Sequence, residues 1–174
     1  MKKLEDYITS INDFPKNGII YRDITSVLES KDGLKLAIDS MQDLINNIDF
    51  DVVVAPESRG FIFGMPIAYN LNKSFVPVRK PGKLPREVIS QEYELEYGSS
   101  ILQIHKDAIK KGDRVVIIDD LIATGGTIQA IVKLVEKLGG KVILICSLIE
   151  LVDLKARELL GEYNIKSCVK FKGE

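Results

Sequence analysis

Apolar residues recur along the chain in two spacings, and their alternation predicts an α/β fold. Runs of branched apolar residues, typical of strands covered on both faces, occupy Asp51–Ala55, Ser74–Val78, Arg114–Asp119 and Lys141–Ile149. Apolar residues at three- and four-residue steps, typical of helices, fill Phe61–Leu71 and Thr127–Leu138. Strands that alternate with helices indicate right-handed βαβ units and a mostly parallel central sheet flanked by helices.

The first fifty residues predict two helices separated by a turn. The apolar spacing within Leu4–Ile11 marks a short amphipathic helix, and the turn residues of Asp13–Gly18 end it. A long helix with one buried face follows over Leu34–Ile48, with Asp32 as its N-cap.

The segment from Val115 to Thr127 carries the strongest chemical signal. Four branched apolar residues lead into Asp119 and Asp120, and the small-residue loop Ala123-Thr124-Gly125-Gly126-Thr127 then opens a helix. Open parallel sheets bind ligands beyond the carboxyl ends of their strands. Backbone N–H groups at a helix N-terminus, with hydroxyls beside them, hold a phosphate. The pattern favours a ligand such as ribose 5-phosphate, with carboxylates on the diol and the loop on the phosphate.

Two better-known phosphate loops are excluded here, and one structural alternative is weaker. The segment has no lysine of the kind that the nucleotide-triphosphate loop requires. Its glycines are adjacent, unlike those of the dinucleotide fingerprint. An Asp-Asp pair that merely caps a turn would explain the acids, but it would leave the Thr-Gly-Gly-Thr run unexplained.

A second anion contact is expected at Ala55–Gly60, which also follows a strand and opens a helix. Arg59 would add a forked charge to the backbone donors there, as suits a pyrophosphate. The alternative is an exposed loop arginine that pairs with Glu57.

The stretch Arg79–Arg86 places four cations among glycine and prolines, and it precedes Gln91–Tyr97 and Ser100–Ile104, which predict an antiparallel hairpin. We expect a flexible basic loop carried by this hairpin. Such a lid would neutralise a leaving pyrophosphate and exclude water from a reactive sugar cation. A solvated surface turn is the alternative.

Taken alone, the stretch Asn17–Ile24 predicts a strand in the core. As a base pocket, it could stack a purine on Tyr21 or Phe14 and contact the edge of the base with backbone groups.

Bulk properties place the chain among single-domain globular proteins. Its 174 residues suffice for one core. The 24 basic and 25 acidic side chains give a net charge of −1, so no overall field favours nucleic acid or a membrane surface. With neither a signal peptide nor a membrane span recognisable in the sequence, we expect a cytoplasmic protein.

The cysteines and the single histidine offer no further chemistry. Cys146 and Cys168 lie in apolar runs, where reduced thiols act as small hydrophobes, and no Cys/His cluster has zinc-ligand spacing. We expect His105 to be a surface residue at the end of a strand.

Five motifs in this order resemble the adenine phosphoribosyltransferase branch of the type I phosphoribosyltransferase family, which uses 5-phosphoribosyl 1-pyrophosphate (PRPP). The resemblance runs from about Phe14 to Ile149. The motifs are Phe14-Pro15-x-x-Gly18-Ile-x-Tyr21-Arg22-Asp23-Ile24, Glu57-Ser58-Arg59-Gly60-Phe61, Arg79-Lys80-Pro81-Gly82-Lys83-Leu84-Pro85, Leu95-Glu96-Tyr97-Gly98 and Asp119–Thr127.

The resemblance implies one phosphoribosyltransferase domain over residues 1–174, in which residues 1–26 contribute a base-binding hood. It implies transfer of the phosphoribosyl group of PRPP to adenine, with Mg²⁺ bound mainly through PRPP and water rather than directly by the protein, and a homodimer. The resemblance also implies a cis peptide bond between Glu57 and Ser58.

The same resemblance implies a set of site residues. Glu96, Arg59 and Arg79 would be catalytic, and Glu96 would contact the imidazole edge of adenine. Adenine would bind to Ile20, Tyr21, Arg22 and Leu121. PRPP would bind to Glu57, Ser58, Arg59, Arg79, Lys80, Lys83, Asp119, Asp120, Ala123, Thr124, Gly125, Gly126 and Thr127.

Two other functions fit the same pattern. A 6-oxopurine phosphoribosyltransferase, acting on hypoxanthine, guanine or xanthine, would need a donor facing the oxygen, and the lysines of Cys168–Lys172 are candidates. A non-catalytic regulator that senses PRPP would need a nucleic-acid-binding surface, which neither the short segment before Phe14 nor the net charge favours.

Overall fold

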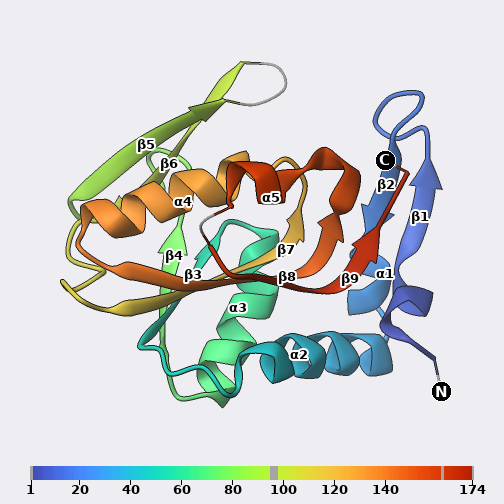
Figure 1. Ribbon diagram of the computed structural model, residues 1–174, viewed down its shortest axis with the longest axis horizontal. Helices are drawn as coiled ribbons and strands as arrows, with labels where there is room; N and C mark the ends of the chain where they lie inside the picture. Colours follow the sequence, from blue (N-terminus) through green and yellow to red (C-terminus); the bar gives the residue numbers. More distant parts are fainter. Residues whose placement is uncertain (1, 95–97, 162, 174) are drawn as a thin grey trace.

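A five-stranded parallel sheet forms the centre of the computed structural model, which describes residues 2–94, 98–161 and 163–173 (Figure 1). Its strand order is β4-β3-β7-β8-β9, and all neighbouring pairs are parallel. The strands are β3 (Val52–Pro56), β4 (Ser74–Val78), β7 (Arg114–Ile122), β8 (Lys141–Leu151) and β9 (Ile165–Phe171). The predicted α/β fold with a mostly parallel sheet is therefore confirmed, although β7 and β8 extend beyond the predicted ends at Asp119 and Ile149.

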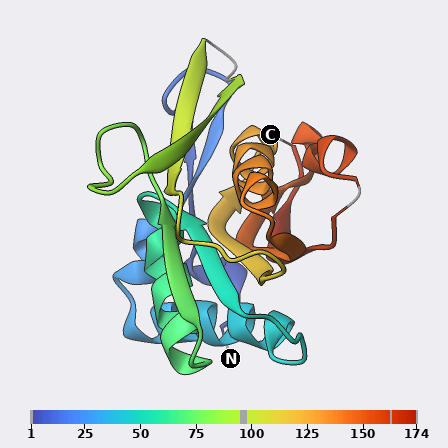
Figure 2. The same cartoon turned by 90° about the vertical axis from the view of Figure 1, so that its left-hand side faces the viewer.

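Helices cover both faces of this sheet (Figures 1 and 2). On one face, α2 (Lys31–Ile45) and α3 (Arg59–Asn70) pack Met41, Ile45 and Phe63 against alternate strand residues. On the other face, α4 (Gly126–Lys137) and the short α5 (Ala156–Leu159) form a second core. This two-sided burial explains why every residue of β3 is buried. Among the described helices, none has the length and apolar character needed to cross a membrane.

The N-terminal prediction was wrong in two details. The first helix is a single 3-10 turn, η1 (Leu4–Tyr7), and Ile11 lies in a strand and is 39% exposed. That strand, β1 (Thr9–Asn12), pairs antiparallel with β2 (Ile20–Asp23) before the short α1 (Thr25–Leu28). So short a helix gains little by itself, and backbone pairing with β2 outweighs the helical spacing.

The N-cap of α2 is Ser30, not Asp32. The Ser30 hydroxyl accepts a 3.1 Å hydrogen bond from the Gly33 N–H, whereas Asp32 lies in the first turn. A carboxylate there still interacts favourably with the helix dipole.

The predicted antiparallel hairpin is present as β5 (Val88–Glu94) and β6 (Ser99–His105). It rises beyond the edge at which the parallel strands end, as does the β1–β2 hairpin (Figure 1). His105 is not a surface residue, since it is only 8% exposed and its Nε2 accepts a hydrogen bond from the Arg86 N–H.

Both cysteines are free. Cys146 is buried, and burial raises its pKa and raises that of Cys168 to about 12. Both thiols are therefore protonated at neutral pH, as expected for small hydrophobes.

The chain order fixes where a ligand can bind. β3 lies between β4, which follows it in the chain, and β7, which comes later. The connections after β3 and β7 therefore lead to opposite faces of the sheet, where α3 and α4 begin. In open α/β sheets, such a switch in direction leaves a crevice at the carboxyl ends of the two strands.

Candidate active site

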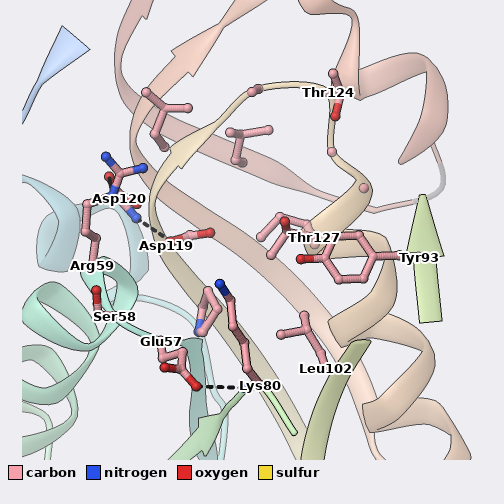
Figure 3. A pocket seen from close by; sticks show the side chains of 17 residues that line it. Glu57, Ser58, Arg59, Lys80, Tyr93, Leu102, Asp119, Asp120, Thr124 and Thr127 are labelled. Atoms are coloured by element: carbon pink, nitrogen blue, oxygen red, sulfur yellow. Dashed lines mark hydrogen bonds and ion pairs between the residues drawn. The ribbon is translucent and has the colours of Figure 1, made fainter. Parts of the chain in front are cut away.

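A cavity of about 440 Å³ lies at the carboxyl ends of β3 and β7 (Figure 3). Its polar wall comes from the two strand-to-helix loops. Of the predicted PRPP-binding residues, the lining includes Glu57, Ser58, Arg59, Lys80, Asp119, Asp120, Ala123, Thr124, Gly125, Gly126 and Thr127.

The loop between β7 and α4 has the backbone shape of an anion cradle. Gly125 adopts a left-handed conformation, with φ of 91°, and α4 begins at the next residue. Only glycine adopts such a φ without strain. The first N–H groups of α4 therefore lie at the end of the helix that borders the cavity. The hydroxyl residues Thr124 and Thr127 line the same wall.

Two adjacent carboxyl groups form the floor between the loops. Asp119 and Asp120 are both buried, and Asp119 Oδ1 accepts a 2.8 Å hydrogen bond from the Asp120 N–H. Burial and the neighbouring Asp120 charge raise the pKa of Asp119 well above its ordinary value. Burial also raises the pKa of Asp120, although Arg59 opposes this shift.

Asp120 retains an unused acceptor. Its Oδ2 lies 3.1 Å from Arg59 Nε in an ion pair, but it accepts a hydrogen bond with proper geometry from no described residue. A buried polar atom left in this state is costly. A ligand hydroxyl in the cavity would satisfy it.

Arg59 joins the acid pair to the β1–β2 hairpin. Its Nε contacts Asp120, and its Nη1 donates a 2.8 Å hydrogen bond to the Tyr21 hydroxyl. The arginine therefore does not pair with Glu57, and that alternative is wrong. A Cβ at the following Gly60 would lie 2.7 Å from Pro56 Cδ and 3.1 Å from Asp119 Oδ1, so glycine allows the start of α3 to approach the acids closely.

Glu57 instead holds the beginning of the basic loop. Its Oε1 accepts a 2.7 Å hydrogen bond from the Lys80 N–H, and Arg79 Nε lies 3.3 Å from the same oxygen. Burial opposes ionisation of Glu57, but these two partners outweigh it and lower the pKa. The Lys80 side chain is left to point into the cavity (Figure 3). The Glu57–Ser58 peptide bond is cis, as expected.

A second, smaller pocket of about 200 Å³ lies beneath the β1–β2 hairpin. It is lined by the four residues of the predicted adenine-binding set, Ile20, Tyr21, Arg22 and Leu121. Its walls are mainly apolar, and Phe14 packs edge-on against Tyr21 with ring centroids 5.2 Å apart. Arg59 and Leu121 line both this pocket and the larger cavity, so the two spaces adjoin.

Three predicted residues are not placed in these linings. Arg79 and Lys83 belong to the basic loop, outside the walls of the cavity as the structure has it. Glu96 lies outside the described residues.

Sequence reasoning missed several lining residues. Tyr93 and Leu102 come from the β5–β6 hairpin, and Leu151 and Leu154 come from the end of β8 and the 3-10 turn η2 (Val152–Leu154). The strand prediction ended at Ile149, two residues too early. The rule that ligands bind beyond the carboxyl ends of strands would have pointed to Leu151 if the apolar run had been followed to its end.

Comparisons with known proteins agree with this geometry. The phosphoribosyl transferase domain family matches residues 23–173. The adenine phosphoribosyltransferase of Lachnoclostridium phytofermentans is 63% identical over 174 residues, which is the whole of both chains. That of Agathobacter rectalis is 55% identical, again over the whole of both.

Solved structures are similar too. The crystal structure of adenine phosphoribosyltransferase from Thermoanaerobacter pseudethanolicus has a TM-score of 0.93 and 53% identity, covering 97% of this chain and 100% of that one. The Saccharomyces cerevisiae enzyme, complexed with an imino-altritol bisphosphate and adenine, has a TM-score of 0.89 and 36% identity, covering 95% and 96%.

Proposed function

The chain belongs to the phosphoribosyltransferase domain family, among its adenine phosphoribosyltransferases, and we propose that its two adjoining pockets are the PRPP and adenine subsites. The enzyme transfers the 5-phosphoribosyl group of PRPP to adenine and releases AMP and pyrophosphate. One observation carries the assignment of the subsites. A polar cavity with an anion cradle meets an apolar pocket at Arg59 and Leu121, so a sugar phosphate and a flat base can meet at that junction.

The β7–α4 loop would hold the 5-phosphate, and the two acids would hold the ribose. The backbone N–H groups of Ala123–Thr127 and the hydroxyls of Thr124 and Thr127 would donate hydrogen bonds to the three phosphate oxygens. Asp119 and Asp120 precede this loop in β7 and lie toward the junction of the two pockets. The unused Oδ2 of Asp120 would accept a hydrogen bond from a ribose hydroxyl.

The loop after β3 and the basic loop would bind the pyrophosphate. Ser58 and Arg59 lie at the N-terminus of α3, where dipole and charge favour an anion, and Lys80 points into the cavity (Figure 3). Glu57 would act indirectly, since it holds Arg79 and the Lys80 backbone. Arg79 and Lys83 would reach the leaving group when the basic loop closes over the cavity.

The hood, residues 1–26, would supply the adenine site. The β2 backbone at Ile20–Arg22 would contact the edge of the base, while Tyr21 and Leu121 pack on its faces. Arg59 orients Tyr21 through their hydrogen bond. Glu96 would orient the imidazole edge of adenine in the forward reaction and manage its proton in the reverse direction.

Mg²⁺ fits this site as a partner of the substrate. The described residues contain no group of three His, Cys, Asp or Glu side chains that could hold a metal, while Asp119 and Asp120 offer hard oxygen ligands nearby. Mg²⁺ retains water and prefers phosphate oxygens and one or two carboxylates. When bound, it would neutralise charge on the diphosphate.

The reaction breaks the bond between C1 of the ribose and the pyrophosphate oxygen and forms a bond from C1 to adenine N9, which loses its proton. Positive charge develops on C1 and the ring oxygen as pyrophosphate leaves, as in glycoside transfer. Asp119 and Asp120 fix the ribose and favour that charge, and Arg59, Arg79 and Lys80 stabilise the departing anion. Catalysis is then mainly positioning and electrostatics.

The proposed subsites are tested by a spectrophotometric assay of adenine with PRPP and Mg²⁺, with hypoxanthine, guanine and xanthine as competitors. We expect a nucleotide to form from adenine and from none of the other three bases, because none of the described residues that line the base pocket is a lysine.

Glu96→Gln is expected to lower turnover more than it weakens PRPP binding. Gly126→Val should weaken PRPP binding strongly, because a side chain there should block the approach of the phosphate to the backbone. A Cβ at this position would also lie 3.3 Å from the Glu94 carbonyl, which leaves little room for it to turn aside. Unchanged PRPP affinity in this variant would remove the loop from the phosphate site.

We also propose a cytoplasmic homodimer with no nucleic-acid or membrane partner. The large side chains Met65 and Tyr69 are exposed on α3, and exposed apolar groups of this kind favour association. Light scattering after gel filtration measures the oligomeric state.

A further inference from the structure

A short segment of the chain contacts both proposed subsites. Residues 151–160 leave the end of β8, form η2 and α5, and pass above the carboxyl edge of the sheet (Figure 1). Leu151 and Leu154 line the base pocket. Ala156 and Leu160 back the phosphate loop, since a Cβ at Gly125 would lie 3.2 Å from a side-chain carbon of each. We call residues 151–160 the bridging segment.

The conformation of the bridging segment is not stable without contacts to the rest of the domain. Its helix α5 has four residues and no side-chain cap, and the residue before it, Lys155, has a left-handed backbone with φ of 56°. A helix of this length is unstable without tertiary contacts. The position of the segment must therefore be fixed by contacts with the rest of the domain.

The strongest of these contacts is made by Arg157. Its Nε and Nη2 donate hydrogen bonds of 2.5 and 2.8 Å to the two carboxylate oxygens of Glu150, and Nη2 also reaches the Ile165 carbonyl at 3.2 Å. Glu150 is 2% exposed and accepts a further bond from the Ser167 hydroxyl, which in turn accepts one from Ser147. The forked pair thus ties the bridging segment to both β8 and β9.

We propose that Arg157 is a positioning residue that sets the adenine pocket and the 5-phosphate loop together. The inference rests on the proposed subsites. Because Leu154 and Ala156 lie on either side of one short turn, a shift of the segment displaces the wall of the base pocket and the support of Gly125 at once. An anchor outside both pockets therefore influences the affinity for both substrates.

The decisive experiment is the steady-state kinetics of Arg157→Lys, which keeps the charge but loses the planar fork. We expect KM for adenine and KM for PRPP to rise together by roughly threefold to tenfold, the size of effect typical of residues that act on a site from outside it. Glu150→Gln should give the same joint rise, and the double variant should be no worse than the more impaired single variant.

The matched control is Ile45→Val, which removes one buried methylene from α2, outside the linings of both pockets, and lowers stability modestly. It should leave both KM values unchanged at a temperature where all variants are folded. A change in only one KM, unchanged KM values in both Arg157→Lys and Glu150→Gln, or additive effects in the double variant would overturn the inference. Absence of any turnover by the unaltered enzyme would instead refute the proposed subsites.

Discussion

Two buried acids at the same edge of the sheet, Asp120 and Glu150, have opposite surroundings. They lie on the neighbouring strands β7 and β8, and each is at most 3% exposed. Glu150 uses both carboxylate oxygens, and the Arg157 hydrogen bonds lower its pKa despite burial. Asp120 has an oxygen with no hydrogen bond from any described residue, and burial raises its pKa. The satisfied acid ties neighbouring parts of the fold together, whereas the unsatisfied one costs stability, as is common for residues of functional sites.

Asp120→Asn should produce the largest effect. Loss of a charged acceptor for a ribose hydroxyl is expected to weaken PRPP binding by roughly tenfold to a hundredfold, because a hydrogen bond to a charged group contributes about 1.5–3 kcal/mol. Isothermal titration with PRPP and Mg²⁺ measures it, with circular dichroism as the control for folding. Affinity within twofold of the unaltered enzyme would show that the Asp120 carboxylate does not bind the ligand.

Glu150→Gln should reduce stability in addition to raising both KM values. The amide cannot accept both arms of Arg157 and places an N–H₂ where an acceptor is needed, so the free energy of unfolding should fall by about 2 kcal/mol. Urea denaturation provides the measurement. A variant as stable as the unaltered protein would contradict the structural role of the pair.

Asp119→Asn should change stability in the opposite direction, and the change should depend on pH. Because burial and Asp120 raise the pKa of Asp119, ionisation of this acid destabilises the folded state as pH rises above the ordinary value of about 4. The variant should therefore be more stable than the unaltered protein near pH 8, with a higher free energy of unfolding. The difference should shrink as pH falls and the folded acid takes up its proton.

Thermal unfolding of both proteins between pH 5 and pH 8 measures this difference. Asp113→Asn, which changes a carboxyl that lies outside both pockets, controls for the general effect of removing an acid. A difference that stays constant with pH, or that grows as pH falls, would contradict the charge argument.

The smallest effect is expected for Lys170→Met. Lys170 Nζ lies 3.9 Å from Glu150 Oε2 and is half exposed, so the free energy of unfolding should change by less than about 0.5 kcal/mol. The preference for adenine should also persist, because Lys170 does not line the base pocket. Hypoxanthine turnover altered by this substitution would revive the 6-oxopurine alternative.

Sequence patterns predicted the elements that local spacing specifies. The boundaries of β4 agree with the prediction, and α4 begins within one residue of it. Patterns failed where a competing contact decided the outcome. Ile11 has helical spacing from Leu4, but backbone pairing between β1 and β2 places it in a strand. His105 was expected to be a surface residue at the end of a strand, yet the fold buries it against the start of β5.

By itself, the sequence determined the α/β class, the acid pair with the small-residue loop that follows it, and the basic segment, because consecutive residues specify each of them. The tertiary structure decided which partner each charge takes. Arg59 pairs with Asp120 and Tyr21, and Glu57 holds Lys80. Arg157 anchors a segment that lines the smaller pocket and packs behind Gly125 of the larger one. These pairings join residues from different strands and loops, and burial makes each of them costly to break, so they depend on topology rather than on local order.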